Sequence, residues 1–188
     1  MITAFYKLLN NSLRVDLLVR IHTSKGGANV SMLADVMEQS GLGLSGVSQY
    51  LKQLEAFHVI RRERAGRYVN YIPDLVAADP RVRAAVRLIV ANESKRQAFE
   101  GIFAALMNPF RARVVAAVAS VGEISGEEIC DKTNHQMKHL KRDLQEAVEA
   151  GLLDPSDSEP RVAVYRYRPP EDRTARKLVE LCFPDRIL

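Results

Sequence analysis

The sequence has little of what marks several large classes of protein. It contains no tryptophan and two cysteines, Cys130 and Cys182, among 188 residues. Two cysteines are too few for a disulfide framework, so we expect a reducing, cytoplasmic environment. No apolar run approaches the roughly 18 residues that a membrane span needs, and the first residues lack the apolar core of a signal peptide. These absences predict a globular cytoplasmic protein with no membrane association.

Motifs of catalysis are missing as well. The chain has no Gly-rich phosphate loop, no nucleophile elbow and no carboxylate pair in a recognisable motif. Asp154, Asp157 and Glu159 lie in a segment with proline and serine that is typical of a solvated loop. The sequence therefore predicts a protein that is not an enzyme.

Charge is distributed unevenly along the chain, although the net charge is only +4. Residues 1–94 carry 12 Lys and Arg against 8 Asp and Glu, whereas residues 95–188 carry 15 of each. Because phosphates attract clustered cations, a nucleic-acid-binding surface is expected mainly in the first half.

The most informative segment extends from residue 44 to residue 72. Val47, Leu51 and Leu54 recur at helical spacing, and Phe57 continues their face one turn later. The opposite face is polar, and Ser45 is expected to cap the helix by accepting a backbone N–H. This pattern predicts an amphipathic helix over residues 45–57.

A basic hairpin is predicted directly after this helix. A strand begins at Val59, the pair Ala65-Gly66 supplies a turn, and a second strand returns to residue 72. Four arginines crowd residues 59–72, with only Glu63 against them. A polar-faced helix beside a basic hairpin is the geometry of a winged helix-turn-helix, in which the helix enters the major groove and the wing contacts phosphates. The alternative is a solvated helix followed by a charged edge strand.

The second half repeats this order of signals. Asn108-Pro109 is expected to start a helix, Ser125 and Glu128 form a capping box, and Asn134 is expected to cap the next helix. In that helix Met137, Leu140, Leu144 and Val148 are expected to face inward. The pattern Arg67-x-x-x-Tyr71 recurs as Arg161-x-x-x-Tyr165. Chance similarity of two helical patterns is the alternative to a duplication.

We therefore predict a mainly α fold with small β-hairpin wings, arranged as two tandem winged helix-turn-helix domains over residues 1–92 and 93–188. The residues expected to contact DNA are Ser45, Ser48, Gln49, Lys52, Gln53, Arg61, Arg62, Arg64, Arg67, His135, Lys138, His139 and Arg142. A second expectation concerns the helix that starts at Asp79-Pro80. Its apolar positions Val82, Val86, Ile89 and Val90, with Leu178 and Leu181 near the C-terminus, favour a homodimer. A monomeric pseudo-dimer is the alternative.

The first copy resembles the ArsR-type winged-helix regulators. The resemblance rests on Arg14, on Ser48-Gln-Tyr-Leu51-Lys52-Gln-Leu54, and on Gly66-Arg67-Tyr-Val-Asn-Tyr71. It covers residues 3–92 and, more weakly, residues 102–182. The resemblance implies a transcriptional regulator that binds double-stranded DNA sequence-specifically, usually as a symmetric dimer. This chain departs from the pattern because it carries both domains itself.

The metal sites of ArsR-type sensors are not matched. Such sensors place paired cysteines on the third helix, or His and acidic ligands on the helix after the wing. Here residues 31–35 lack a thiol, and residues 80–98 lack His and Cys. His135 and His139 have zinc-compatible spacing, but they lie beside Lys138 and Arg142, so contact with nucleic acid or plain solvation is expected instead of metal binding. We predict no metal and no cofactor.

One further alternative comes from a different class of protein. Tandem winged helices also serve as architectural modules that bind proteins, as in chromosome-organisation complexes. The basic first wing favours DNA, whereas the neutral second half and its acidic loop favour a protein partner.

Overall fold

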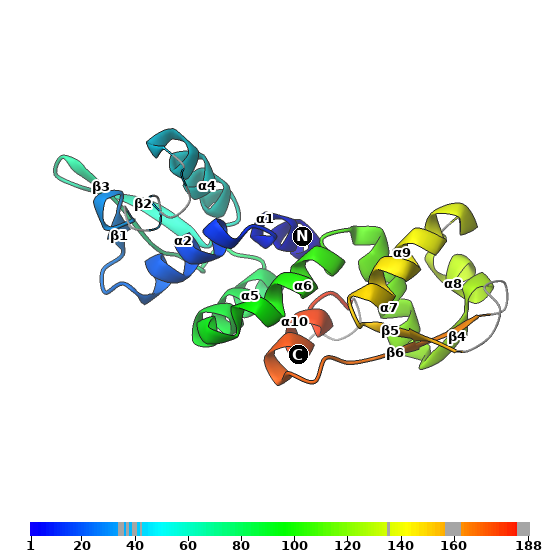
Figure 1. The fold of residues 1–188 in the computed structure, drawn as a ribbon. Coiled ribbons are helices and arrows are strands. Elements are labelled where there is room, and N and C mark those ends of the chain that lie inside the picture. The colour runs from blue at the N-terminus through cyan, green and yellow to red at the C-terminus, as the bar shows by residue number, and fades with distance from the viewer. Residues whose placement is uncertain are drawn as a thin grey trace. The chain divides into compact units, whose positions relative to one another are not determined.

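The fold is that of a computed structural model, which describes residues 1–33, 36, 38, 41, 43–134, 136–156 and 163–183. Helices predominate, and two antiparallel sheets of three strands each complete the described part of the chain (Figure 1). The mainly α class with small β elements is thereby confirmed. By its internal contacts the chain divides into two units. Unit 1 comprises residues 8–96 with Met1, and unit 2 comprises residues 97–188 with residues 2–7.

In unit 1 helices pack against part of a small sheet. Its described elements are α2 (Ser12–Thr23), β1 (Ala28–Asn29), η1 (Ser31–Leu33), α4 (Leu44–Ala56), β2 (Ile60–Ala65), β3 (Tyr68–Pro73), α5 (Pro80–Ala91) and η2 (Glu93–Lys95). The strands lie in the order β1-β3-β2. Gly27, with φ +86, lets the chain approach β3 closely, since a Cβ there would clash with Ile72 and the Tyr71 carbonyl oxygen.

Unit 2 also combines helices with one small sheet. Its described elements are α6 (Arg96–Leu106, with Arg96 itself in unit 1), α7 (Pro109–Val121), β4 (Glu123–Ser125), α8 (Gly126–Thr133), α9 (Met137–Glu149), β5 (Leu153–Pro155), β6 (Val164–Tyr167) and α10 (Arg173–Glu180). Its strands lie in the order β4-β6-β5, so the first, third and second strands are neighbours as in unit 1. The two units therefore share one strand order.

An arginine near the start of α2 and another near the start of α7 add to this likeness. Arg14 Nη1 donates to the Leu8 carbonyl at 2.9 Å, and Arg111 Nη1 donates to the Ala105 carbonyl at 3.0 Å. Each arginine thus reaches back six residues to the end of the preceding helix. The same local contact recurs at the same place in the two units.

Three of the predicted helix starts are confirmed. Asp79 accepts hydrogen bonds from the backbone N–H groups of Arg81 and Val82 ahead of α5, and Asn108 accepts one from Phe110 ahead of α7. The capping box of Ser125 and Glu128 forms at α8. In each case side-chain oxygens bind N–H groups that the first helical turn leaves without partners.

The predicted cap at Asn134 is wrong. Asn134 has a left-handed backbone, φ 53, and ends α8 rather than starting α9. Asparagine tolerates this conformation better than most residues, because its short amide can bond locally. Gln136 precedes α9 instead, without a side-chain cap.

The apolar stripe on α5 is not an exposed surface. Val82, Val86 and Ile89 are fully buried, and α5 packs against α2. Leu178 and Leu181 are also buried. The homodimer is predicted from these positions as an apolar surface for a second chain to cover, and their burial within the chain removes that reason.

The N-terminal helix α1 (Ile2–Leu9) contributes its first turns to unit 2. The Tyr6 hydroxyl donates to the Leu178 carbonyl at 2.6 Å, and the Tyr6 ring lies 5.2 Å from the Phe103 ring. Burial raises the pKa of Tyr6 well above its usual range. The sequence assigned residues 2–7 to the first domain, whereas their contacts belong to unit 2.

Within the described residues, no single helix has the length and hydropathy that a membrane span requires. Residues 93–106 and 109–121 meet the criterion only as a pair, with a bend of 101° between them.

Candidate nucleic-acid interface

Helix α4 presents one apolar and one polar face, as predicted. Val47, Leu51 and Leu54 are fully buried. Gln49 and Lys52 are exposed on the outer side. Burying one face fixes the helix on unit 1 and leaves side chains with hydrogen-bonding groups in solvent.

Two predicted roles on α4 change. Ser45 is exposed but does not cap the helix, because Gly43 is the N-cap residue, with no side-chain hydrogen bond. Gln53 is half-buried, and its Oε1 is buried without a hydrogen-bond partner in the described part of the chain. A glutamine needs both amide atoms to bind adenine bidentately, so Gln53 is poorly placed for that role. Ser48 is half-buried as well.

The hairpin β2–β3 projects from unit 1 (Figure 1). Its two strands pair without interruption from Ile60 opposite Pro73 to Ala65 opposite Tyr68. All of β2 beyond Ile60 is exposed, although neighbouring strand residues point to opposite faces. Neither face of this outer part is covered, so its side chains extend into solvent on both sides.

The four arginines of the hairpin divide into two pairs. Arg62 Nε lies 2.9 Å from a Glu55 carboxylate oxygen, a contact that raises the pKa of Arg62. Arg61 lies 3.7 Å from Glu63 and 4.0 Å from Asp74. These two guanidinium groups are partly neutralised by neighbouring carboxylates.

Arg64 and Arg67 are the other pair, and both are exposed. Among the described residues, neither has a carboxylate within ion-pair distance. Arg67 instead lies over the Tyr68 ring, 5.2 Å from its centroid. Positive charge available to an anionic partner is therefore concentrated toward the tip of the hairpin.

A histidine anchors the base of the hairpin. His22, near the end of α2, donates its Nε2–H to the Val59 carbonyl at 2.8 Å, directly before β2. Burial lowers the pKa of His22. The neutral ring is thereby favoured, and it holds the start of β2 against α2.

Helix α9 of unit 2 also exposes cations. Lys138, His139 and Arg142 are exposed. Leu140 and Leu144 face the core as predicted, while Met137 is 42% exposed, contrary to the expected inward position. His135 lies outside the described residues. Helix α9 thus presents a group of exposed cations on unit 2.

In its described residues, the second hairpin offers less free positive charge than the first. Arg166 lies 3.0 Å from Glu123, and Arg168 lies 3.6 Å from Asp154. Asp157, Glu159 and Arg161 lie outside the described residues. The described cations of β6 and its C-terminal flank therefore have carboxylate partners.

A buried ionic network that the sequence did not predict holds α9 against α7. Arg111 is 5% exposed, and its Nε lies 3.6 Å from Asp143, which is 2% exposed. Arg111 also pairs with Glu146, and Asn108 donates to Asp143 at 3.1 Å. Burial lowers the pKa of Arg111, and Asp143 opposes that effect. The signal available in the sequence was the correspondence of Arg111 with Arg14.

In unit 1 an aromatic contact replaces this network. The guanidinium of Arg14 lies over the Tyr50 ring, 4.4 Å from its centroid. Tyr50 occupies the position in α4 that Asp143 occupies in α9, counted from the first residue of each helix. Equivalent helix pairs are therefore joined by a cation–π contact in unit 1 and by ion pairs in unit 2.

The two cysteines are both free thiols. Cys182 is buried and Cys130 is half-buried, with a pKa raised by burial first and by neighbouring acidic groups second. In the part of the chain that the structure describes, no three His, Cys, Asp or Glu side chains gather closely enough to hold a metal ion.

Comparison with protein-family models gives no match for this chain, and comparison with curated proteins gives no significant match.

Proposed function

We propose that this chain is a DNA-binding transcriptional regulator composed of two tandem winged helix-turn-helix domains, with ArsR-like character in the first. The observation that carries the proposal is the projecting hairpin β2–β3, whose tip exposes Arg64 and Arg67, in the same unit as the polar face of α4. Guanidinium groups without carboxylate partners are suited to bind phosphates, because they have no competing ion pair to lose.

In this proposal unit 1 supplies most of the binding. Helix α4 lies in the major groove, where Gln49 reads a base edge and Lys52 lies near the backbone. The hairpin contacts phosphates on the flank of the site. Exposed Lys138, His139 and Arg142 on α9 add a weaker contact from unit 2.

Selection of bound duplexes from a random pool, followed by anisotropy titration of the best sequence, tests the proposal. We expect Gln49→Ala to change the preferred base at one position, at a cost of about 1–3 kcal/mol for the original sequence. Gln53→Ala is the matched control on the same helix, and it should leave the preference unchanged because its Oε1 is buried. A pool with no enriched sequence would contradict base-specific recognition.

A single chain is proposed to act alone on an asymmetric site. Burial of the apolar positions of α5 and α10 supports this, since Val82, Val86, Ile89 and Leu178 are already covered within the chain. We expect light scattering to give the mass of one chain, 21.0 kDa, and footprinting to show strong protection on one side of the site. A dimer of chains that protects a palindrome would contradict the single-chain proposal and leave DNA binding intact.

The second candidate is a protein-binding architectural module. It is favoured by the described second hairpin, where Arg166 and Arg168 are already paired with carboxylates. Under this alternative, random-duplex selection fails and the double-stranded DNA affinity shows no sequence dependence.

A further inference from the structure

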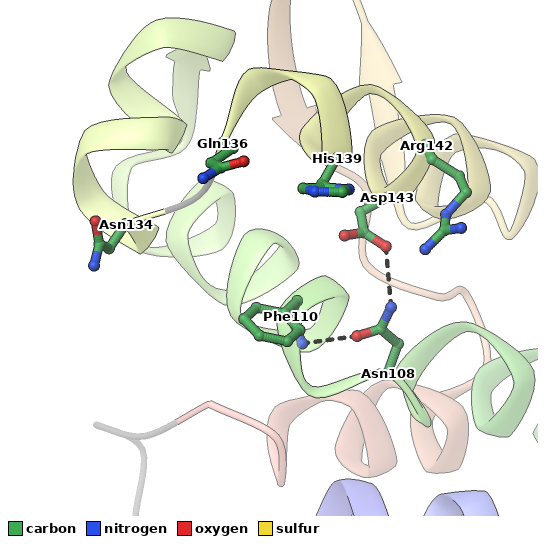
Figure 2. Close-up of a pocket in the computed structure, with 7 residues that line it drawn as sticks. All are labelled: Asn108, Phe110, Asn134, Gln136, His139, Arg142 and Asp143. Atoms are coloured by element: carbon green, nitrogen blue, oxygen red, sulfur yellow. Dashed lines mark hydrogen bonds between the residues drawn. The ribbon is translucent and has the colours of Figure 1, made fainter.

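A cavity of about 410 Å3 lies in unit 2 beside the first turns of α7 and α9 (Figure 2). Its volume falls in the range of roughly 300–1,000 Å3 that small-molecule sites occupy. Asn108 and Asp143 form its inner wall and are hydrogen-bonded to each other at 3.1 Å. Because Asp143 is also paired with Arg111, its charge is largely compensated before any ligand enters.

Two aromatic rings line this cavity from different helices. Phe110 belongs to α7 and is 48% exposed, so part of its ring is accessible. The guanidinium of Arg113 lies 4.6 Å from the Phe110 ring centroid. His139 belongs to α9 and lines the cavity on the opposite side from Phe110 in Figure 2. Rings on facing walls suit a flat aromatic group, which gains stacking contacts on both of its faces.

The remaining lining groups are hydrogen-bonding amides and one cation. Asn134 and Gln136 are exposed, and each side-chain amide offers donors and an acceptor. Such amides match the mixed donor and acceptor edge of a heterocyclic base better than the bare edge of a hydrocarbon ring.

Arg142 supplies the cation at the same cavity. Its carboxylate partner is Glu146 at 3.7 Å, and Glu146 is also bound by the buried Arg111. Arg142 therefore shares a single, distant carboxylate and is 71% exposed at its side chain. A guanidinium group that is exposed and only weakly paired is suited to bind a phosphate.

We propose that this cavity binds a nucleotide. The base stacks between Phe110 and His139, its edge bonds to Asn134 and Gln136, and its phosphate binds Arg142. The nucleotide comes either from solution, as a mononucleotide, or from an unpaired stretch of a nucleic-acid strand. When the cavity is occupied, His139 and Arg142 are not available to duplex phosphates.

Calorimetric titration of the full chain with 5′-AMP and 5′-CMP, without any duplex, tests this proposal independently of duplex binding. We expect at least one nucleotide to bind ten or more times more tightly than its nucleoside or ribose 5-phosphate, because only the nucleotide uses both rings and Arg142. Phe110→Leu should weaken nucleotide binding about tenfold and leave ribose 5-phosphate unaffected. Arg142→Gln should weaken both of these ligands.

Arg173→Gln is the matched control, because it removes one exposed cation from α10 and leaves the cavity lining unchanged. Equal losses in Arg142→Gln and Arg173→Gln would overturn the proposal, as would nucleotide binding no tighter than that of ribose 5-phosphate. Circular dichroism of each variant establishes that it is folded. The last comparison is between 5′-AMP and a single strand of five deoxyadenylates. If the strand binds more tightly and Phe110→Leu weakens its binding to the same extent, the natural ligand is an unpaired nucleic-acid strand. Tighter binding of 5′-AMP assigns the ligand to solution.

Discussion

Joint replacement of Arg64 and Arg67 by alanine is expected to weaken binding to every duplex and to flatten its salt dependence. Each phosphate contact that is lost lowers the slope of log affinity against log salt by about 0.9, so two contacts lower it by about 1.8. Between 50 and 200 mM salt, the unmodified chain should therefore lose about tenfold more affinity than the variant. Anisotropy titrations at four salt concentrations measure this slope directly.

The hairpin supplies its own control. Arg61→Ala with Arg62→Ala removes the same formal charge from the same hairpin, but these side chains are engaged with Glu63, Asp74 and Glu55. We expect a clearly smaller change in slope for this second pair. Equal changes would mean that only the total charge of the hairpin matters, and an unchanged slope in both variants would refute phosphate contact by the wing.

Replacement of Arg111 by alanine is expected to have the largest effect on stability. It would leave Asp143, which is 2% exposed, without its cation. Breaking a buried ion pair from one side costs about 3–5 kcal/mol. With a typical urea m-value near 2 kcal/mol per molar, the midpoint of the unit 2 transition should fall by roughly 1.5–2.5 M. Urea denaturation followed by circular dichroism measures that midpoint.

Arg14→Ala is the matched substitution in unit 1. It removes a hydrogen bond to the Leu8 carbonyl and the stacking on Tyr50, and leaves no buried carboxylate behind. We expect a cost of about 1–2 kcal/mol from those two contacts. In unit 2, Arg111→Met combined with Asp143→Asn should recover much of the loss, because no buried charge remains. A loss from Arg14→Ala as large as that from Arg111→Ala would contradict the role given to the ionic network.

The features predicted best from the sequence are those that involve residues within one helical turn of each other. The caps at Asp79, Asn108 and Ser125 are confirmed, because each side chain bonds to N–H groups two or three residues further on. The cap at Ser45 is wrong, since α4 already begins at Leu44 after Gly43. Serine and asparagine also serve other positions near helix ends, so residue type alone does not locate a cap.

Features that depend on contacts between residues far apart in the sequence could not be predicted in this way. Strands β1 and β4 contain two and three residues and exist because they pair with β3 and β6. Likewise, the sequence treated the four hairpin arginines as equivalent. Their division depends on where Glu55 and Asp74 lie in space, and spacing along the chain does not encode those distances.

The first turns of α1 and helix α10 belong to one unit but are made far apart in time during translation. Tyr6 precedes Leu178, whose carbonyl accepts from the Tyr6 hydroxyl, by 172 residues. The contact between the two helices therefore forms only after the intervening residues have been translated. Since exposed apolar side chains invite association with other chains, we expect α1 to be more open to such association until α10 has been made. A fragment that begins at residue 97 would keep Phe103 and lose the Tyr6 ring that packs on it.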